Sequence, residues 1–294
     1  MTATKRLFHR SLLRALGFIA LVGALALSVF VASGATAAAA TSAQAKPTIV
    51  LVHGAWADSS SWSGVIQRLQ ADGFTVLAPA NPLRDLQSDS AYISSFLAQV
   101  PGPIVLVGHS YGGMVITDAA NGNSNVKALV YVSAFIPDQN ENTFQLVGKD
   151  SHIVPPGTPG ATANLTPRGF PLPNPTNAVP APTDVDLYIN PASFRDIFAA
   201  DVSPQQTSIM AVTQRPATVT SFSNTSGAPA WTSIPASAIL GGADHAIGTD
   251  SLLTMAKRLP GGRVVEIPGA SHALMVSHPD AVTAFILAAV QSIH

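Results

Sequence analysis

The stretch Ile104-Val-Leu-Val-Gly-His-Ser-Tyr-Gly-Gly-Met114 decides the fold of this chain. Its first four residues are apolar and mostly β-branched, which predicts a strand, and a helical pattern begins at Met114. Between them lies Gly108-His-Ser-Tyr-Gly112, a Gly-x-Ser-x-Gly turn so tight that the residues two before and two after the serine must be small. Such a nucleophile elbow holds its serine in a strained backbone at the carboxyl end of a central strand, where α/β sheets bind ligands. We therefore expect Ser110 to be a nucleophile.

On both sides of this stretch, short apolar segments alternate with amphipathic ones. The pattern predicts strands at 48–52, 74–78, 104–107, 126–132, 236–240 and 263–267, and helices at 62–69, 91–100, 114–120, 250–259 and 279–292. We expect Asp250 to cap the fourth helix. Each strand is apolar on both faces, which is typical of a parallel sheet covered by helices on both sides. The predicted fold class is therefore α/β.

The alternation breaks between about residues 138 and 231, a segment that is low in charge and holds ten prolines between Pro155 and Pro191. Only short helices, at 191–200 and 203–212, are predicted within it. Several large apolar side chains nevertheless require burial: Phe144, Phe170, Leu187, Tyr188, Phe194, Phe198 and Met210. An irregular segment of this length inside a domain is usually functional, so we expect an inserted cap over the site.

Residues 1–45 have the pattern of a secretory signal peptide. A basic segment without acidic residues (1–14) precedes an apolar run (15–31) and then small residues. We expect cleavage after Ala43-Gln-Ala45, with Ala35-Thr-Ala37 as the alternative, and hence a secreted domain over 46–294 with no stable membrane association. An uncleaved membrane anchor is the alternative localisation, because the apolar run reaches the short end of the spanning range, about 17–25 residues.

Composition excludes several classes of protein. Hydrophobic residues make up 47% of the 294 and charged residues 11%, which suits one large α/β domain with its own core. Outside residues 1–45, 11 Lys and Arg stand against 16 Asp and Glu, so no basic face is expected and nucleic acid is not an expected partner. The chain has no cysteine, which excludes disulfides, thiolate metal sites and a cysteine nucleophile.

No metal or nucleotide cofactor is expected either, because the chain lacks His-Glu-x-x-His, a P-loop and Gly-x-Gly-x-x-Gly. His272 and His278 are six residues apart, which is not a metal-ligand spacing on a helix. We interpret His109 as a packing residue of the elbow. His245 adjoins Asp244, but two neighbouring residues cannot form a proton relay by themselves.

A serine hydroxyl needs a base to become a nucleophile. Asp244 follows the strand at 236–240, and His272 follows the last strand, so both lie on loops at the carboxyl edge of the sheet. Ser110, Asp244 and His272 occur in the chain order of one known class of triad, with histidine as base and aspartate fixing its tautomer. Asp138, in the loop after the strand at 126–132, remains the alternative acid.

The oxyanion of an acyl-transfer intermediate needs hydrogen-bond donors. The backbone N–H of Tyr111, directly after the nucleophile, and that of Ala55, in the loop after the first strand, are the candidates. We expect His53 to hydrogen-bond its own loop. Trp56, Phe135 and Tyr111 are the candidate walls of the substrate pocket.

Together these segments resemble the α/β-hydrolase fold family, and more narrowly bacterial relatives of the plant methylesterase and hydroxynitrile lyase group. The resemblance covers about residues 47–293. It rests on Val52-His-Gly-Ala-Trp56, Ala78-Pro-Ala-Asn-Pro-Leu83, Gly108-His-Ser-Tyr-Gly-Gly113, Tyr131-Val-Ser-Ala-Phe135, Gly242-Ala-Asp244 and Gly269-Ala-Ser-His272. It implies a core of about six parallel strands, with a small cap inserted after the strand that ends near Phe135.

The resemblance also bears on the reaction. Lyases of this group carry a threonine in place of Gly54 and a lysine in place of Ala273, so a hydrolase is favoured. We expect a secreted serine carboxylesterase that cleaves a small to medium ester or lactone through an acyl-enzyme. The alternatives are a hydroxynitrile lyase-like or cofactor-free oxidative enzyme on the same fold, a ligand-binding relative without turnover, and a hydrolase of polymer surfaces.

Overall fold

The computed structural model describes residues 46–154, 157 and 163–293. Its main sheet has six strands in the order β2-β1-β3-β4-β8-β9, and all of its strand pairs are parallel. The strands are β1 (Thr48–Val52), β2 (Val76–Leu77), β3 (Ile104–His109), β4 (Val126–Val132), β8 (Ala236–Gly241) and β9 (Val264–Ile267). The predicted α/β class and the six-stranded parallel sheet are therefore confirmed.

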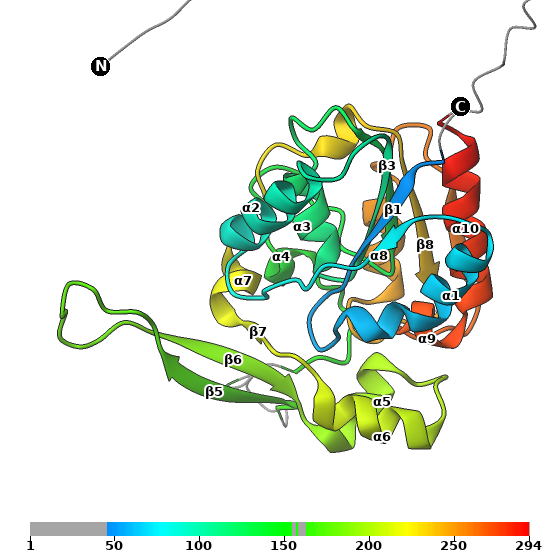
Figure 1. The fold of residues 1–294 in the computed structure, drawn as a ribbon. Helices are drawn as coiled ribbons and strands as arrows, with labels where there is room; N and C mark the ends of the chain where they lie inside the picture. The colour runs from blue at the N-terminus through cyan, green and yellow to red at the C-terminus, as the bar shows by residue number, and fades with distance from the viewer. Residues whose placement is uncertain (1–45, 155–156, 158–162, 294) are drawn as a thin grey trace, which may run out of the picture. The chain divides into compact units, whose positions relative to one another are not determined.

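Helices cover both faces of this sheet (Figure 1). One face packs against α1 (Ser63–Ala71), α9 (Leu274–Ser277) and α10 (Pro279–Gln291), and the other against α2 (Leu86–Leu97), α3 (Gly112–Ala119) and α8 (Thr249–Ala256). Strand β1 shows how the sequence directs this arrangement. Ile49 and Leu51 point to the face covered by α1, α9 and α10, whereas Val50 and Val52 point to the face covered by α2, α3 and α8. All four side chains are fully buried.

Some predicted helix starts were displaced. Helix α2 begins at Leu86 rather than at 91, because the side chain of Asp85 caps it by accepting a hydrogen bond from the N–H of Ser88 (2.9 Å). Helix α8 begins at Thr249 after Gly248 in a left-handed conformation (φ 96°). Asp250 therefore lies in the first turn and is not the cap.

The insertion between β4 and β8 contains its own sheet. Its elements are α4 (Thr143–Leu146), β5 (Leu165–Pro171), β6 (Thr183–Ile189), α5 (Pro191–Phe198), α6 (Pro204–Thr213), β7 (Ala217–Thr218), α7 (Val219–Ser223) and the short 3-10 helix η2 (Ala230–Thr232). Strands β5, β6 and β7 pair antiparallel in that order. In Figure 1, β5 and β6 form a long hairpin that projects beyond the helices. The predicted helices correspond to α5 and α6, and the cap-like insertion is confirmed.

The three strands of this segment were not predicted. Strand β5 contains Pro167, Gly169 and Pro171, residues that normally argue against a strand. They are tolerated because β5 is an edge strand, with β6 as its single partner in the three-stranded sheet, so a missing N–H need not break a ladder on both sides.

Burial in the insertion was only partly predicted. Leu187, Phe194 and Phe198 are buried, but Phe144 is 50% exposed. The signal-peptide prediction concerns residues outside those that the structure describes. Within the described ranges, no helix combines the length and the hydropathy needed to cross a bilayer.

Candidate active site

Ser110 lies at the turn between β3 and α3. Its backbone is left-handed (φ 53°), a conformation that non-glycine residues adopt only at an energetic cost. The Ser110 N–H donates to the carbonyl of Ser133 (3.2 Å), and its own carbonyl accepts from the N–H groups of Gly113 (2.8 Å) and Phe135 (3.2 Å). These bonds to the loop after β4 hold the strained residue in place.

The close packing predicted around the serine is confirmed. A Cβ on Gly112 would lie 2.5 Å from the carbonyl oxygen of Val52, and one on Gly108 would lie 2.7 Å from that of Gly112. A Cβ on Gly54 would lie 2.6 Å from the Cβ of Ser110. The loop after β1 therefore approaches the elbow as closely as glycine allows.

His272 and Asp244 form a fully buried pair. The Nδ1 atom of His272 donates to Oδ2 of Asp244 at 2.6 Å, and neither side chain is exposed. The other carboxylate oxygen accepts the N–H groups of Ala246 (3.0 Å) and Ile247 (2.9 Å). Because Nδ1 carries the proton, the lone pair of this imidazole lies on Nε2.

That Nε2 atom is buried and has no hydrogen-bond partner in the described part of the chain. The hydroxyl of Ser110 is thus not hydrogen-bonded to His272 here. His109 links them: it precedes Ser110, its Nε2 donates to the carbonyl of His272 (3.0 Å), and the two rings lie 4.7 Å apart. Burial and the neighbouring His272 hold the pKa of His109 well below its ordinary value.

The alternative acid, Asp138, is exposed, and its carboxylate accepts the N–H of Gln139 (2.8 Å). Of the two carboxylates, Asp244 is the one that the fold pairs with His272.

The two candidate oxyanion donors meet at the elbow. Ala55 is buried, and Gly54 brings its loop so close that a Cβ there would lie 3.0 Å from the backbone nitrogen of Tyr111. In the described residues, neither the Ala55 N–H nor the Tyr111 N–H donates a hydrogen bond to another protein group.

His53 supports the same loop, as expected. Its Nδ1 donates to the carbonyl of Gly54 (2.9 Å), and its Nε2 accepts the N–H of Asn81 (3.0 Å). Burial lowers the pKa of His53 to about 4, so this histidine stays neutral near neutral pH.

Tyr111 is not a pocket wall, contrary to one prediction. Its ring is fully buried, and its hydroxyl donates to Oδ2 of Asp89 at 3.0 Å. Asp89 also accepts the N–H of Arg84 (3.1 and 3.2 Å to its two oxygens). Burial raises the pKa of Asp89 to about 6. No local motif predicts this pair, because the two residues come from α2 and from the start of α3.

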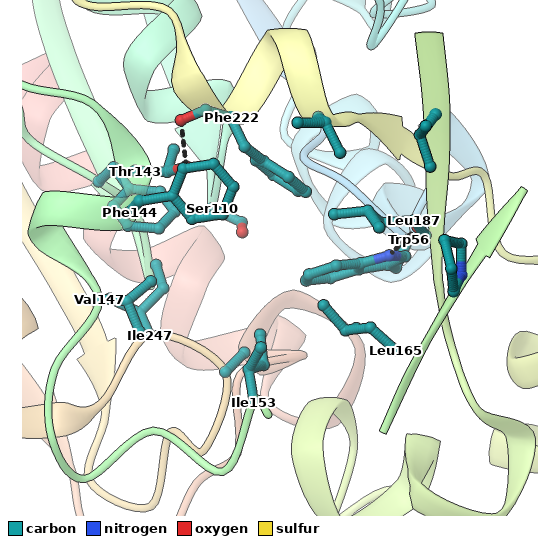
Figure 2. Close-up of a pocket in the computed structure, with 15 residues that line it drawn as sticks. Trp56, Ser110, Thr143, Phe144, Val147, Ile153, Leu165, Leu187, Phe222 and Ile247 are labelled. Atoms are coloured by element: carbon teal, nitrogen blue, oxygen red, sulfur yellow. Dashed lines mark hydrogen bonds between the residues drawn. The ribbon is translucent and has the colours of Figure 1, made fainter. Parts of the chain in front are cut away.

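Ser110 opens into a cavity of about 450 Å³, across from Trp56 (Figure 2). The candidate walls Trp56 and Phe135 both line it. The complete lining is Trp56, Ser110, Phe135, Thr143, Phe144, Val147, Ile153, Leu165, Pro167, Val185, Leu187, Val219, Phe222, Ala246 and Ile247. None of these residues is charged, and most of them belong to the insertion, whose proline-rich sequence gave no periodicity from which they could have been predicted.

A sequence model of the alpha/beta hydrolase family matches residues 49–285, which include the elbow and the buried His272–Asp244 pair. The chain belongs to the α/β-hydrolase family. The resemblance inferred from the short motifs is thereby confirmed.

Among curated proteins, this α/β-hydrolase is similar to a carbendazim hydrolyzing esterase from a Nocardioides species, with 32% identity over 113 residues (34% of this chain, 47% of the relative). It is also similar to a pyrethroid hydrolase from Sphingobium wenxiniae, with 29% identity over 133 residues (40% and 46%). Each match thus spans about half of the relative. An alpha/beta hydrolase from Aspergillus novofumigatus matches at 25% identity over 254 residues (82% and 95%).

Among solved structures, polyneuridine aldehyde esterase superimposes with a TM-score of 0.66 at 19% identity, covering 83% of this chain and 99% of that one. A methylesterase from Arabidopsis gives 0.64 at 17% identity, with 84% and 99% covered. Tomato methylketone synthase I gives 0.65 at 19% identity, with 85% and 100% covered. At these identities the likeness establishes a shared fold.

Proposed function

We propose that this α/β-hydrolase is a secreted serine carboxylesterase for apolar esters or lactones of small to medium size. The observation that carries the proposal is the buried His272–Asp244 pair, which lies on loops at the same edge of the sheet as Ser110. Ser110 itself lines an uncharged cavity of about 450 Å³. Acyl transfer by a serine requires an imidazole as base and a carboxylate that holds this imidazole in one tautomer. The elbow serine and the buried pair supply these three groups.

In the proposed reaction, the Ser110 hydroxyl rotates toward His272 and transfers its proton to Nε2 as Oγ attacks the ester carbonyl. The oxyanion that forms accepts hydrogen bonds from the free N–H groups of Ala55 and Tyr111. Each bond stabilises the transition state by about 3–4 kcal/mol. Collapse of this intermediate expels the alcohol, which takes the proton from Nε2, and leaves an acyl group on Ser110. Water then attacks the acyl-enzyme by the same route in reverse and releases the acid.

Two observations favour ester hydrolysis over cyanohydrin cleavage. Among the described residues that line the cavity, no cation could stabilise a departing cyanide. Ala273, where the lyases of the resembled group carry lysine, is fully buried, and its N–H donates to the carbonyl of Phe198 (2.8 Å). The names of two relatives, a carbendazim hydrolyzing esterase and a pyrethroid hydrolase, agree with hydrolysis of an ester.

The test compares the full chain with its Ser110→Ala variant on p-nitrophenyl acetate, butyrate, octanoate and dodecanoate, on methyl esters and on lactones. We expect Ser110→Ala to lower kcat/KM by at least about 10³-fold. Ser88→Ala, on the exposed side of α2, is the matched control and retains activity. Intact-mass measurement during turnover of a slow ester should detect the acyl adduct on the wild type and none on Ser110→Ala.

The absence of turnover on every ester by folded wild-type protein would contradict the proposal. Cyanide release from cyanohydrins would then indicate the lyase, and saturable binding without turnover would indicate a ligand-binding relative. Secretion is tested separately, by sequencing the amino terminus of the protein recovered from the culture medium. A new terminus at Lys46 is expected, and retention of residues 1–45 in the membrane fraction would contradict it.

A further inference from the structure

Three side chains from separate segments meet outside the cavity. His152 comes from the loop after α4, Asp196 from α5, and His245 from the loop after β8. Their potential ligand atoms all lie within 4.8 Å of one another. None of the three lines the cavity, and the proposed catalytic steps use none of them.

The carboxylate of Asp196 lies between the two imidazoles. Its Oδ2 accepts a hydrogen bond from Nδ1 of His152 (2.7 Å), and its Oδ1 lies 3.3 Å from Nδ1 of His245. The His245 Nδ1 also lies 3.0 Å from the backbone carbonyl oxygen of Asp196. The two rings are stacked, with centroids 3.8 Å apart and planes inclined by 24°. Both Nδ1 atoms thus face one carboxylate.

Two imidazole nitrogens and one carboxylate oxygen form a common zinc donor set. Around a tetrahedral ion with bonds of about 2.0–2.1 Å, ligand atoms lie about 3.3 Å apart. The two nitrogen–oxygen separations here are 2.7 and 3.3 Å. The side chains are 46%, 59% and 29% exposed for His152, Asp196 and His245, so an ion can enter from solvent without local unfolding.

We propose that His152, Asp196 and His245 bind one divalent first-row transition ion of the zinc type, with water in the remaining position. Each imidazole would ligate through the lone pair of Nδ1 with its proton moved to Nε2, so the hydrogen bonds to Asp196 are exchanged for metal bonds. Mg²⁺ and Ca²⁺ do not suit the site, because they prefer oxygen ligands throughout.

The position of the site gives the ion a structural role. Asp196 belongs to the insertion, whereas His245 belongs to the core loop that also carries Asp244. The His152 N–H already donates to the carbonyl of His245 (2.8 Å), so the segments are in place before an ion arrives. A bound ion would tie α5 to this loop, whose next residues, Ala246 and Ile247, line the cavity and hold Asp244. We therefore expect it to stabilise the contact between insertion and core.

The test is isothermal titration of the purified full chain with Zn²⁺ after dialysis against a chelator. We expect one ion per chain, and at least about a tenfold loss of affinity in His152→Asn and in Asp196→Asn, since each removes one of three ligands. His278→Asn is the matched control, because His278 also faces a carboxylate (Asp201 Oδ2, 3.4 Å) but forms no three-residue cluster of potential ligands within the described residues. It should bind Zn²⁺ as the wild type does.

A thermal scan gives a second readout. At a free Zn²⁺ concentration of about 100 times the dissociation constant, Tm should rise by about 5–10 °C in the wild type and in His278→Asn. Mg²⁺ should have no such effect. The proposal is overturned if the wild type binds no Zn²⁺ at millimolar concentration, or if His152→Asn and Asp196→Asn bind it as tightly as His278→Asn.

Discussion

The core and the insertion contribute to the site in different ways. The core supplies the polar groups, and each is held by several hydrogen bonds: Ser110 by the loop after β4, and Asp244 by two backbone N–H groups and His272. The insertion supplies most of the cavity wall, which is made mainly of apolar side chains. The residues that the proposed reaction needs are thus each fixed by several hydrogen bonds. The cavity wall depends mainly on apolar contacts, which other apolar side chains could also make.

Trp56 joins the two regions. This core residue is left-handed (φ 58°), and its N–H donates to the carbonyl of Arg215 in the insertion (2.7 Å). Its indole Nε1 donates to the carbonyl of Leu187 on β6 (2.7 Å). The wall is therefore fixed relative to Ser110 by two hydrogen bonds from one residue.

The largest effect on the rate of the proposed reaction should follow from removing the charge of Asp244. Asp244→Asn should lower kcat of the proposed esterase by about 10²–10⁴-fold, because the amide no longer fixes the tautomer of His272 or stabilises its charged form. Asp138→Asn is the control and should change kcat less than about twofold, since Asp138 is exposed and bonds locally. Steady-state kinetics on one p-nitrophenyl ester decide between them, and an equal loss in both variants would contradict the choice of Asp244.

Stability should also separate the two regions. In Gly112→Ala, the new Cβ would lie 2.5 Å from the carbonyl oxygen of Val52, and we expect a loss of about 1–3 kcal/mol of unfolding free energy. Gly169→Ala, in β5 of the insertion, meets no atom within 4 Å and should change stability by less than about 0.5 kcal/mol. Chemical denaturation measures both. If Gly169→Ala were as damaging as Gly112→Ala, the contrast between core and insertion would not hold.

Substrate selection should respond to the insertion. Phe144 on α4 lines the cavity and is 50% exposed, so Phe144→Ala should leave the fold intact. We expect kcat/KM for long-chain or aromatic esters to fall by about 3–10-fold, with that for the acetate unchanged, because only larger acyl groups lose contact. Tyr92→Ala, at 48% exposure on α2, is matched in exposure and does not line the cavity. A similar loss in both variants would show that the effect is not due to the wall.

The smallest expected effect concerns the pH dependence of stability in the core. Burial raises the pKa of Asp89 to about 6. The contribution of this side chain to the free energy of unfolding is therefore fully present below the pKa of the unfolded state, about 4, and is lost as the pH rises toward 6. Asp89→Asn stays neutral, and its Tm relative to the wild type should therefore rise between pH 4 and pH 7. Thermal scans at the two pH values measure the difference.

Asp280→Asn should behave in the opposite sense. A hydrogen bond from Arg68 lowers the pKa of Asp280, so its contribution is present at neutral pH and lost on acidification. The Tm of this variant relative to the wild type should fall slightly from pH 4 to pH 7, and only slightly because the pair is exposed. Equal trends in the two variants would contradict the role of burial at Asp89.

The core was largely predictable from the sequence because its signals are local. The apolar runs indicated β1, β3 and β4, and Gly108-His-Ser-Tyr-Gly112 indicated the elbow. The sheet of the insertion was not predicted, in part because its edge strand β5 carries proline and glycine, which only an edge position tolerates. Its cavity wall and the His152, Asp196 and His245 cluster are brought together by tertiary packing across long stretches of chain. The orientation of Tyr111 toward Asp89 likewise depends on a contact between α2 and α3 that no spacing encodes.

The close approach of Gly54 and Gly112 to their neighbours has a consequence for evolution. In this structure a side chain added at either position collides with backbone or with Ser110 itself, so a substitution there also requires a shift of the neighbouring loop. Substitutions in the insertion are tolerated more easily, because a wall residue can change size without moving the loops that carry Ser110, Asp244 and His272. New substrate ranges on this scaffold should therefore arise by drift in the insertion, with the reaction inherited unchanged.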